Sequence, residues 1–226
     1  MLAIFDLAFH PALNDFRRVR GAALAIPLLL AFGGGPTGAA LAKPDHSVAA
    51  KFAYCQDCHG PSGQGFRGYY PIPRLGGQQV QYIKNQLEAF LEHRRKNAIM
   101  LNVAHGLDRG MMTAIAQKFH GLDPRPIGGA PRRLIARGQE IFQAGIPQAN
   151  VAACAACHGP NATGKDQIPR LAGQLYEYVV AKLVNWNKER GQIASRPDTS
   201  LIMEPVAHSL TRSQAQAVAA YVSTLR

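Results

Sequence analysis

Several residue types and patterns are scarce in this sequence, and each shortage narrows the class of protein. Segments in which apolar and polar residues alternate as in a half-buried strand are absent, which argues against a fold built on β-sheets. The 226 residues contain only 14 Asp and Glu against 25 Lys and Arg, so the formal charge is +11. Basic runs interleaved with aromatic residues, and the motifs of nucleic-acid-binding modules, are also absent. We therefore expect the positive charge to serve an acidic protein partner or an anionic membrane, and no nucleic acid.

Cysteine is scarce too, and all four cysteines lie in two pentapeptides of the form C-x-x-C-H. Two thiols separated by two residues can each bond to one vinyl group of the same porphyrin, and the histidine that follows lies beneath the iron as its proximal ligand. The pattern predicts two covalently bound haem c groups. The thioether residues would be Cys55, Cys58, Cys154 and Cys157, and the proximal ligands His59 and His158.

Other uses of C-x-x-C fit this sequence less well. A four-cysteine zinc site usually brings its two pairs within about 15 to 20 residues of each other, whereas Cys55 and Cys154 are 99 residues apart. A redox-active dithiol would belong to a βαβ pattern, which is absent, and two independent disulfides would leave both histidines unexplained. Haem attachment is therefore the interpretation that uses every residue of the motif.

The N-terminal 42 residues have the composition of a secretory signal peptide. Three arginines precede an apolar run over residues 21–32, and Ala40-Leu41-Ala42 is a small-residue cleavage pattern before Lys43. The alternative is an uncleaved membrane anchor, because no charged residue lies between 21 and 42. Pro27 and the three glycines at 33–35 disfavour a stable spanning helix, so we expect export and cleavage.

Beyond Lys43 the sequence repeats itself. The C-x-x-C-H pentapeptide recurs at an offset of 99 residues, the motif P-R-L-x-G-Q at 96 and the Ile-Met pair at 103, a drift that loop insertions would produce. Residues 123–131, between the copies, have the proline and glycine content of a linker. We expect an all-α protein of two tandem domains, residues 43–122 and 132–226, each wrapped around a covalently attached haem.

Apolar residues recur with a period near 3.6 where the repeat predicts helices. Thr211 and Gln214 fit a capping box before the last helix, and Asp108 is the expected cap at the equivalent place in the first copy. The two stripes comprise Tyr82, Ile83, Gln86, Leu87, Phe90 and Leu91 in the first copy and Leu175, Tyr178, Val179 and Trp186 in the second.

The sixth ligand of each iron decides between electron transfer and chemistry on a bound small molecule. Met100 and Met203 occupy matching places in the repeat, 41 and 45 residues after their histidines. Their recurrence favours them as axial ligands over core packing, and a thioether ligand raises the reduction potential. His105 and His208 also recur, five positions later, and bis-histidine ligation is the alternative. Met111 and Met112 are rival ligands in the first copy, but they align with the start of the last helix, where we expect packing.

The repeated P-R-L motif supplies candidates for the surroundings of the haem. A ligating histidine usually donates its second ring N–H to a backbone carbonyl, and Pro73 and Pro169 lie within reach in sequence. Arg74 and Arg170 would then be placed to pair with haem propionates. The alternative for these arginines is an exposed position in a helix-entry turn.

With these motifs in place, the chain from about residue 47 to residue 226 resembles the di-haem class I cytochromes c of the cytochrome c4 family. The resemblance is closest in the second half, where Gly138, the second pentapeptide and the motif Pro169–Gln174 stand together. It implies two class I cytochrome c domains with haems near a shared interface, and one-electron transfer in the periplasm or at its membrane. The first half departs from the family pattern, because its opening helix, expected over Ser47–Tyr54, is short and lacks a glycine matching Gly138.

We therefore expect an electron carrier rather than an enzyme. The resemblance implies a donor such as a quinol-oxidising complex or a dehydrogenase, an acceptor such as a terminal oxidase, and possible peripheral association with the membrane. Residues 43–226 hold 22 basic and 12 acidic side chains, and four propionates would reduce their net charge to about +6. This charge would steer an acidic redox partner.

Two other functions are compatible with the haem motifs. The chain could be the cytochrome subunit of a dehydrogenase complex that oxidises sulfide or an alcohol. It could also be a di-haem peroxidase, although that activity needs one iron without a distal side chain, and a methionine recurs in both copies.

Overall fold

The computed structural model describes residues 47–191 and 198–226. The predicted signal segment, residues 1–42, lies outside them. Every regular element in the described residues is helical, and β pairing there is limited to four isolated bridges. The all-α prediction is therefore confirmed. No helix in the described ranges has both the length and the apolar character that a membrane span requires.

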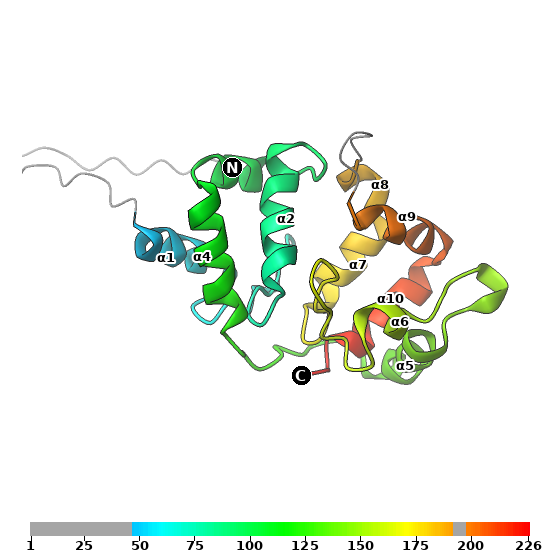
Figure 1. The fold of residues 1–226 in the computed structure, drawn as a ribbon. Helices are drawn as coiled ribbons and strands as arrows, with labels where there is room; N and C mark the ends of the chain where they lie inside the picture. Colours follow the sequence, from blue (N-terminus) through cyan, green and yellow to red (C-terminus); the bar gives the residue numbers. More distant parts are fainter. Residues whose placement is uncertain (1–46, 192–197) are drawn as a thin grey trace, which may run out of the picture. The chain divides into compact units, whose positions relative to one another are not determined.

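The first domain, which we define as residues 47–122, contains four helices: α1 Val48–His59, α2 Val80–Leu91, α3 Ala98–His105 and α4 Arg109–His120 (Figure 1). Helix α2 packs against α3 and α4, and α1 packs against α4. The buried side of α2 is the apolar stripe that the sequence predicted. Its core residues are Ile83, Leu87 and Phe90, which cluster with Met112, Ile115 and Phe119 of α4.

The second domain, which we define as residues 132–226, repeats this plan with more and shorter helices. Helix α10 packs against α5 and α7, and its buried face includes Val218 and Val222. Residues 123–131 join the two domains without helix or strand. The elements are η1 Arg132–Leu134, α5 Ile135–Ala144, η2 Pro147–Ala149, α6 Cys154–His158, α7 Tyr176–Val184, α8 Trp186–Glu189, α9 Ser200–Ser209 and α10 Arg212–Val222.

Two helix ends differ from the expected positions. Helix α1 does not stop at Tyr54 but continues to His59, so that the first haem motif is its last turn. No glycine or proline interrupts residues 48–59, whereas Gly145 and Pro147 separate α5 from α6 in the second domain. The second-copy stripe is also shorter than expected, since α7 ends at Val184 and Trp186 begins the separate helix α8.

The predicted caps are present at both copies of the last helix. The Thr211 side chain accepts from the backbone N–H of Gln214, and the Gln214 side chain accepts from that of Thr211 at 2.8 Å, so the capping box is complete. Asp108 accepts from the backbone N–H of Met111 at 2.8 Å in the first domain. These bonds fix where the last helix of each domain begins.

The first and last helices of the two domains pack differently. In the second domain Gly138 of α5 lies against the backbone of α10, where an added Cβ would sit 1.9 Å from the carbonyl oxygen of Ala217. In the first domain, which lacks the matching glycine, Phe52 of α1 packs on Phe119 of α4 with ring centroids 4.8 Å apart. Side-chain packing there replaces the close backbone approach of the second domain.

We expect Gly138→Ala to destabilise the second domain by about 1–3 kcal/mol, because the new methyl group would meet backbone atoms that cannot rotate away. Denaturant unfolding of the haem-loaded protein measures this. Gly68→Ala is the matched control, since an added Cβ there meets nothing within 4 Å, and its effect should stay within about 0.5 kcal/mol. Equal midpoints for the two variants would contradict the packing account.

Candidate functional site

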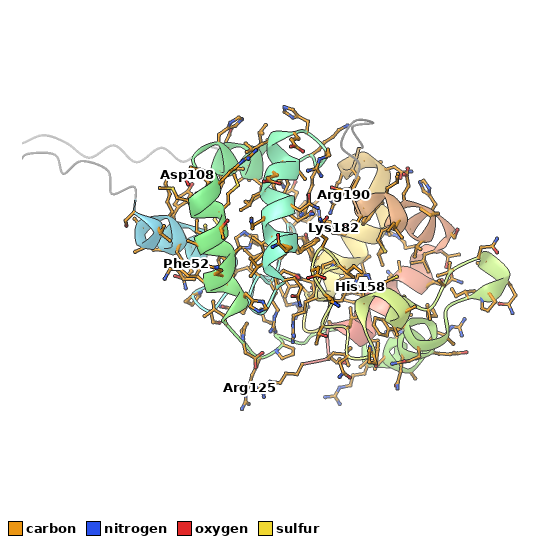
Figure 2. The ribbon with its side chains drawn as sticks, in the orientation of Figure 1. Phe52, Asp108, Arg125, His158, Lys182 and Arg190 are labelled. Carbon is orange, nitrogen blue, oxygen red and sulfur yellow. The ribbon has the colours of Figure 1, made fainter. Side chains whose placement is uncertain are left out.

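The two histidines of the haem motifs occupy equivalent, buried positions at the ends of α1 and α6, where His59 is 7% and His158 is 4% exposed. Figure 2 labels His158 in the second domain. Nδ1 of His59 lies 2.9 Å from the carbonyl oxygen of Pro73, and Nδ1 of His158 lies 2.9 Å from that of Pro169. Because a carbonyl can only accept, Nδ1 carries the proton and Nε2 keeps its lone pair. Each ring is thereby set in the tautomer that binds a metal through Nε2.

Burial lowers the pKa of His59 and of His158 below the ordinary value for histidine, and in each case the hydrogen bond to the proline carbonyl opposes this effect only in part. The neutral ring is therefore the stable form at neutral pH. A neutral imidazole is the form in which histidine binds iron.

A tight loop after each histidine brings the proline carbonyl beneath the ring. The backbone N–H of Gly65 donates to the carbonyl of His59 at 2.8 Å, and that of Gly164 donates to His158 at 2.9 Å. Both glycines have positive φ, +83° and +68°, and an added Cβ would lie 2.5 Å from the carbonyl oxygen of Ile72 or 2.3 Å from that of Ile168. Glycine is required here for backbone conformation and for space.

The two cysteines of each motif are three residues apart, which places them on one side of the helix. Cys55 and Cys154 are half-buried, and burial raises the pKa of each to about 11. Cys58 and Cys157 are exposed. The thiols and the ring nitrogen of each motif thus suit covalent haem attachment, and the bound haem would supply an iron that changes oxidation state by one electron.

The two methionines occupy matching helices. Met100 lies in α3, whose N-cap Asn97 accepts from its backbone N–H at 3.0 Å, and Met203 lies in α9. Both are half-buried. The isoleucines before them, Ile99 and Ile202, are 72% and 64% exposed, so each methionine stands at the boundary between core and surface.

The other candidate ligands are placed less favourably. His105 and His208 are exposed near the ends of α3 and α9, and the His208 ring contacts the side chain of Asn187. Met112 is buried in the core of the first domain and Met111 is half-buried beside it on α4. Met111 and Met112 therefore pack against the core of the first domain.

The guanidinium groups of Arg74 and Arg170 donate to backbone carbonyls, each to one in its own turn and Arg74 also to one in the linker. Arg74 is only 3% exposed and donates to the carbonyls of Gly76 at 2.8 Å and Pro124 at 2.6 Å, so the alternative of an exposed arginine is wrong for Arg74. Burial, and then the nearby charge of Arg170, lower the pKa of Arg74 to about 10. Arg170 is half-buried and donates to Ala172 at 3.2 Å. Pairing with propionates remains a prediction for both.

Two glutamines from the repeated P-R-L-x-G-Q motif join the domains, a role that sequence reasoning missed. The Gln174 side chain accepts from the backbone N–H of Arg74 at 2.9 Å and donates to its carbonyl at 3.0 Å. The Gln78 side chain makes the same two bonds with Arg170, at 2.8 and 3.0 Å. The repeat of the motif was the available signal, since residues 78 and 174 are equivalent.

Sequence reasoning also missed two arginines, Arg95 and Arg190, that lie at the junction of the domains. The backbones of Arg95 and Arg190 form an isolated bridge, and Arg95 donates to the Tyr178 hydroxyl across the junction at 2.6 Å. A buried guanidinium nitrogen of Arg190 has no hydrogen-bond partner among the residues that the structure describes. A cation with an unused donor could hold a haem carboxylate.

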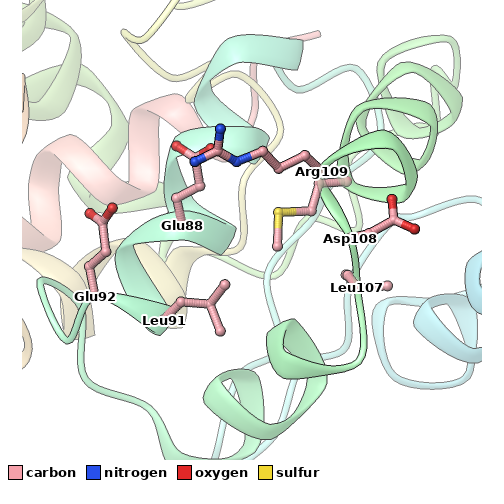
Figure 3. Close-up of a pocket in the computed structure, with 7 residues that line it drawn as sticks. Glu88, Leu91, Glu92, Leu107, Asp108 and Arg109 are labelled. Atoms are coloured by element: carbon pink, nitrogen blue, oxygen red, sulfur yellow. The ribbon is translucent and has the colours of Figure 1, made fainter.

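A surface pocket between the end of α2 and the start of α4 is separate from these groups. It is lined by Glu88, Leu91, Glu92, Leu107, Asp108, Arg109 and Met112, and Figure 3 shows the Arg109 side chain extending across it towards Glu88. Neither His59 nor Met100 lines it. The pocket therefore has no place in the haem site.

Comparison with known proteins identifies relatives that match both domains. The family model for cytochrome c matches residues 48–125 and 135–226. Cytochrome c-552 of Acidithiobacillus ferridurans is 34% identical over 76% of this chain and 73% of its own length. A thiosulfate dehydrogenase electron acceptor of Thiomonas intermedia is 34% identical over 76% of this chain and 78% of its own length. The structure of Acidithiobacillus ferrooxidans cytochrome c4 matches with a TM-score of 0.64 and 34% identity, over 76% of this chain and 99% of that one.

We expect Gly164→Ala to weaken the second site, because the new Cβ would displace the segment that carries the Pro169 carbonyl. The second domain should lose more stability than the roughly 1 kcal/mol that a positive φ alone costs. Gly128→Ala is the matched control, since its φ is +74° but an added Cβ meets nothing within 4 Å. Thermal unfolding followed by haem absorbance measures both variants. A Gly164→Ala protein as stable as the control would refute the steric requirement.

Proposed function

This chain belongs to the cytochrome c family and is a di-haem electron carrier similar to cytochrome c4, and we propose that it takes electrons from a periplasmic sulfur-compound dehydrogenase and passes them towards a terminal oxidase. It binds two covalent haem c groups and transfers electrons without being a catalyst. The observation that supports the role of electron carrier is the duplicated site. Each domain contains one buried neutral histidine held by a proline carbonyl and one half-buried methionine at a matching place.

We propose His59 with Met100, and His158 with Met203, as the axial ligands of the two irons. Supporting this assignment, each histidine keeps Nε2 for the metal, and each methionine stands at the same point of the repeat. Two side-chain ligands leave the iron no open position, so it changes oxidation state without binding a substrate. This arrangement suits a carrier and argues against a peroxidase.

The donor is proposed from the relatives. Two of them, from Thiomonas intermedia and Stutzerimonas stutzeri, are named as thiosulfate dehydrogenase electron acceptors. A second candidate function, a permanent subunit of such a dehydrogenase, is favoured by a solved thiosulfate dehydrogenase of Marichromatium purpuratum, of which this chain covers 36% at 29% identity and a TM-score of 0.67. Copurification of this chain with a catalytic subunit would favour the subunit over the free carrier.

Location in the periplasm and peripheral contact with the membrane also belong to this proposal. They are supported by the signal-like segment at residues 1–42 and by the basic balance of the sequence. Exposed basic side chains occur in both domains, including Lys96 and Lys118 in the first and Lys165 and Lys188 in the second. An acidic partner surface would be attracted to either domain.

We expect Met203→Ala to abolish the methionine-to-iron absorption of the second haem and to lower its reduction potential. The change in the reduction equilibrium should exceed tenfold, or about 59 mV for a one-electron couple. Met100→Ala should do the same to the first haem, while Met112→Ala, a core change, should leave both absorptions in place. If Met203→Ala keeps the absorption of both haems, the ligand assignment is wrong.

We also expect a thiosulfate dehydrogenase supplied with thiosulfate to reduce both haems, at a rate that falls about tenfold or more as salt is raised from low to physiological ionic strength. Stopped-flow absorbance gives the rate and the number of electrons taken per chain. Failure of this enzyme to reduce the protein, together with rapid reduction by a quinol-oxidising complex, would replace the proposed donor.

A further inference from the structure

The reciprocal glutamine contacts between the domains touch the peptide groups that hold the two histidines. The carbonyl oxygen of Pro73 accepts from His59, and the N–H of the same peptide group, contributed by Arg74, donates to Oε1 of Gln174 in the other domain. The second domain repeats the arrangement. There, one peptide group accepts from His158 at the Pro169 carbonyl and donates through the Arg170 N–H to Oε1 of Gln78.

In each of these two series, short hydrogen bonds link a histidine, a Pro–Arg peptide group and a buried glutamine. The four bonds are 2.8 to 2.9 Å long, and Gln78 and Gln174 are 4% and 6% exposed. Each Oε1 also accepts from the backbone N–H of the residue that follows its glutamine. Oε1 of Gln78 accepts from Gln79 at 2.9 Å and Oε1 of Gln174 accepts from Leu175 at 3.0 Å, which fixes the orientation of both amides. Each glutamine side chain is therefore held in one orientation by bonds within the protein.

A peptide group that donates at its N–H becomes a better acceptor at its carbonyl, because hydrogen bonds in series polarise one another. A better acceptor draws the proton of Nδ1 more strongly and makes the histidine a more basic ligand. A more basic ligand stabilises ferric relative to ferrous iron and lowers the reduction potential.

We propose that Gln174 lowers the reduction potential of the first haem and that Gln78 lowers that of the second, each acting across the domain interface through one Pro–Arg peptide group. The glutamines are positioning residues, since they touch neither haem iron nor its ligands. The inference rests on the proposed ligation by His59 and His158. Each haem is thus tuned by a side chain of the opposite domain, and the domain interface is part of both redox centres.

The test is the reduction potential of each haem in Gln174→Ala and Gln78→Ala, prepared as haem-loaded full-length protein and assigned to domains by NMR of the haem methyl groups. Gln174→Ala should raise the potential of the first haem and leave the second in place, and Gln78→Ala should do the reverse. The expected change is severalfold in the reduction equilibrium and at most about tenfold, which is about 59 mV. The Nδ1–H resonance of the affected histidine should shift with it.

Two controls separate tuning from a loosened interface. Gln79→Ala removes a neighbouring glutamine that also crosses the interface, donating to the Thr163 carbonyl at 3.0 Å, but that accepts nothing from a Pro–Arg peptide. It should leave both potentials unchanged. Gln174→Glu keeps an acceptor oxygen and loses the amide donor, so it should hold the first haem at or below its wild-type potential.

The outcomes are distinct. A rise confined to the haem of the opposite domain, and absent from both Gln79→Ala and Gln174→Glu, supports the proposal. Equal shifts of both haems, a shift in the mutated domain only, or no shift while both haems keep their methionine-to-iron absorption would overturn it and leave the electron-carrier function standing. Loss of histidine ligation in the wild-type spectra would instead refute the ligand assignment on which the inference rests.

Discussion

The hydrogen bond from each buried histidine to a proline carbonyl is the interaction on which the site depends. It selects the Nδ1–H tautomer of His59 and His158, and burial keeps both rings neutral. The surrounding structure is arranged to supply that carbonyl. Gly65 and Gly164 turn the chain back beneath each ring, in conformations that other residues adopt only with strain.

The duplicated domain gives the protein two such centres and one shared boundary. The turn that presents the proline carbonyl also carries the arginine backbone that the other domain's glutamine binds. Motif P-R-L-x-G-Q therefore combines two roles, since its proline fixes the histidine of its own domain and its glutamine joins the opposite one. A carrier with two haems benefits from a fixed boundary, because the relative placement of its redox centres then does not vary from one transfer to the next.

Much of this arrangement could be predicted from the sequence, because covalent haem attachment and helix capping leave local signals. The pentapeptides, the Thr211 capping box and the proline carbonyls are all encoded within short spacings. The extension of α1 to His59 and the break before Trp186 were not foreseen, since helix ends depend on which residues tertiary packing stabilises. The glutamine contacts and the Arg95–Arg190 bridge join residues 92 to 100 positions apart, and a pattern within a short stretch of sequence does not show which distant residues pair.

The proposed ligation gives the protein two low-spin haems, each held by one histidine and one methionine, that exchange single electrons. A redox titration of the purified protein, with ferric-state spectra recorded at each potential, is the decisive measurement. We expect two one-electron transitions and methionine-to-iron absorption from both haems in the fully oxidised protein. A spectrum in which either haem lacks that absorption, or binds carbon monoxide rapidly in the reduced protein as isolated, would contradict the proposed ligation.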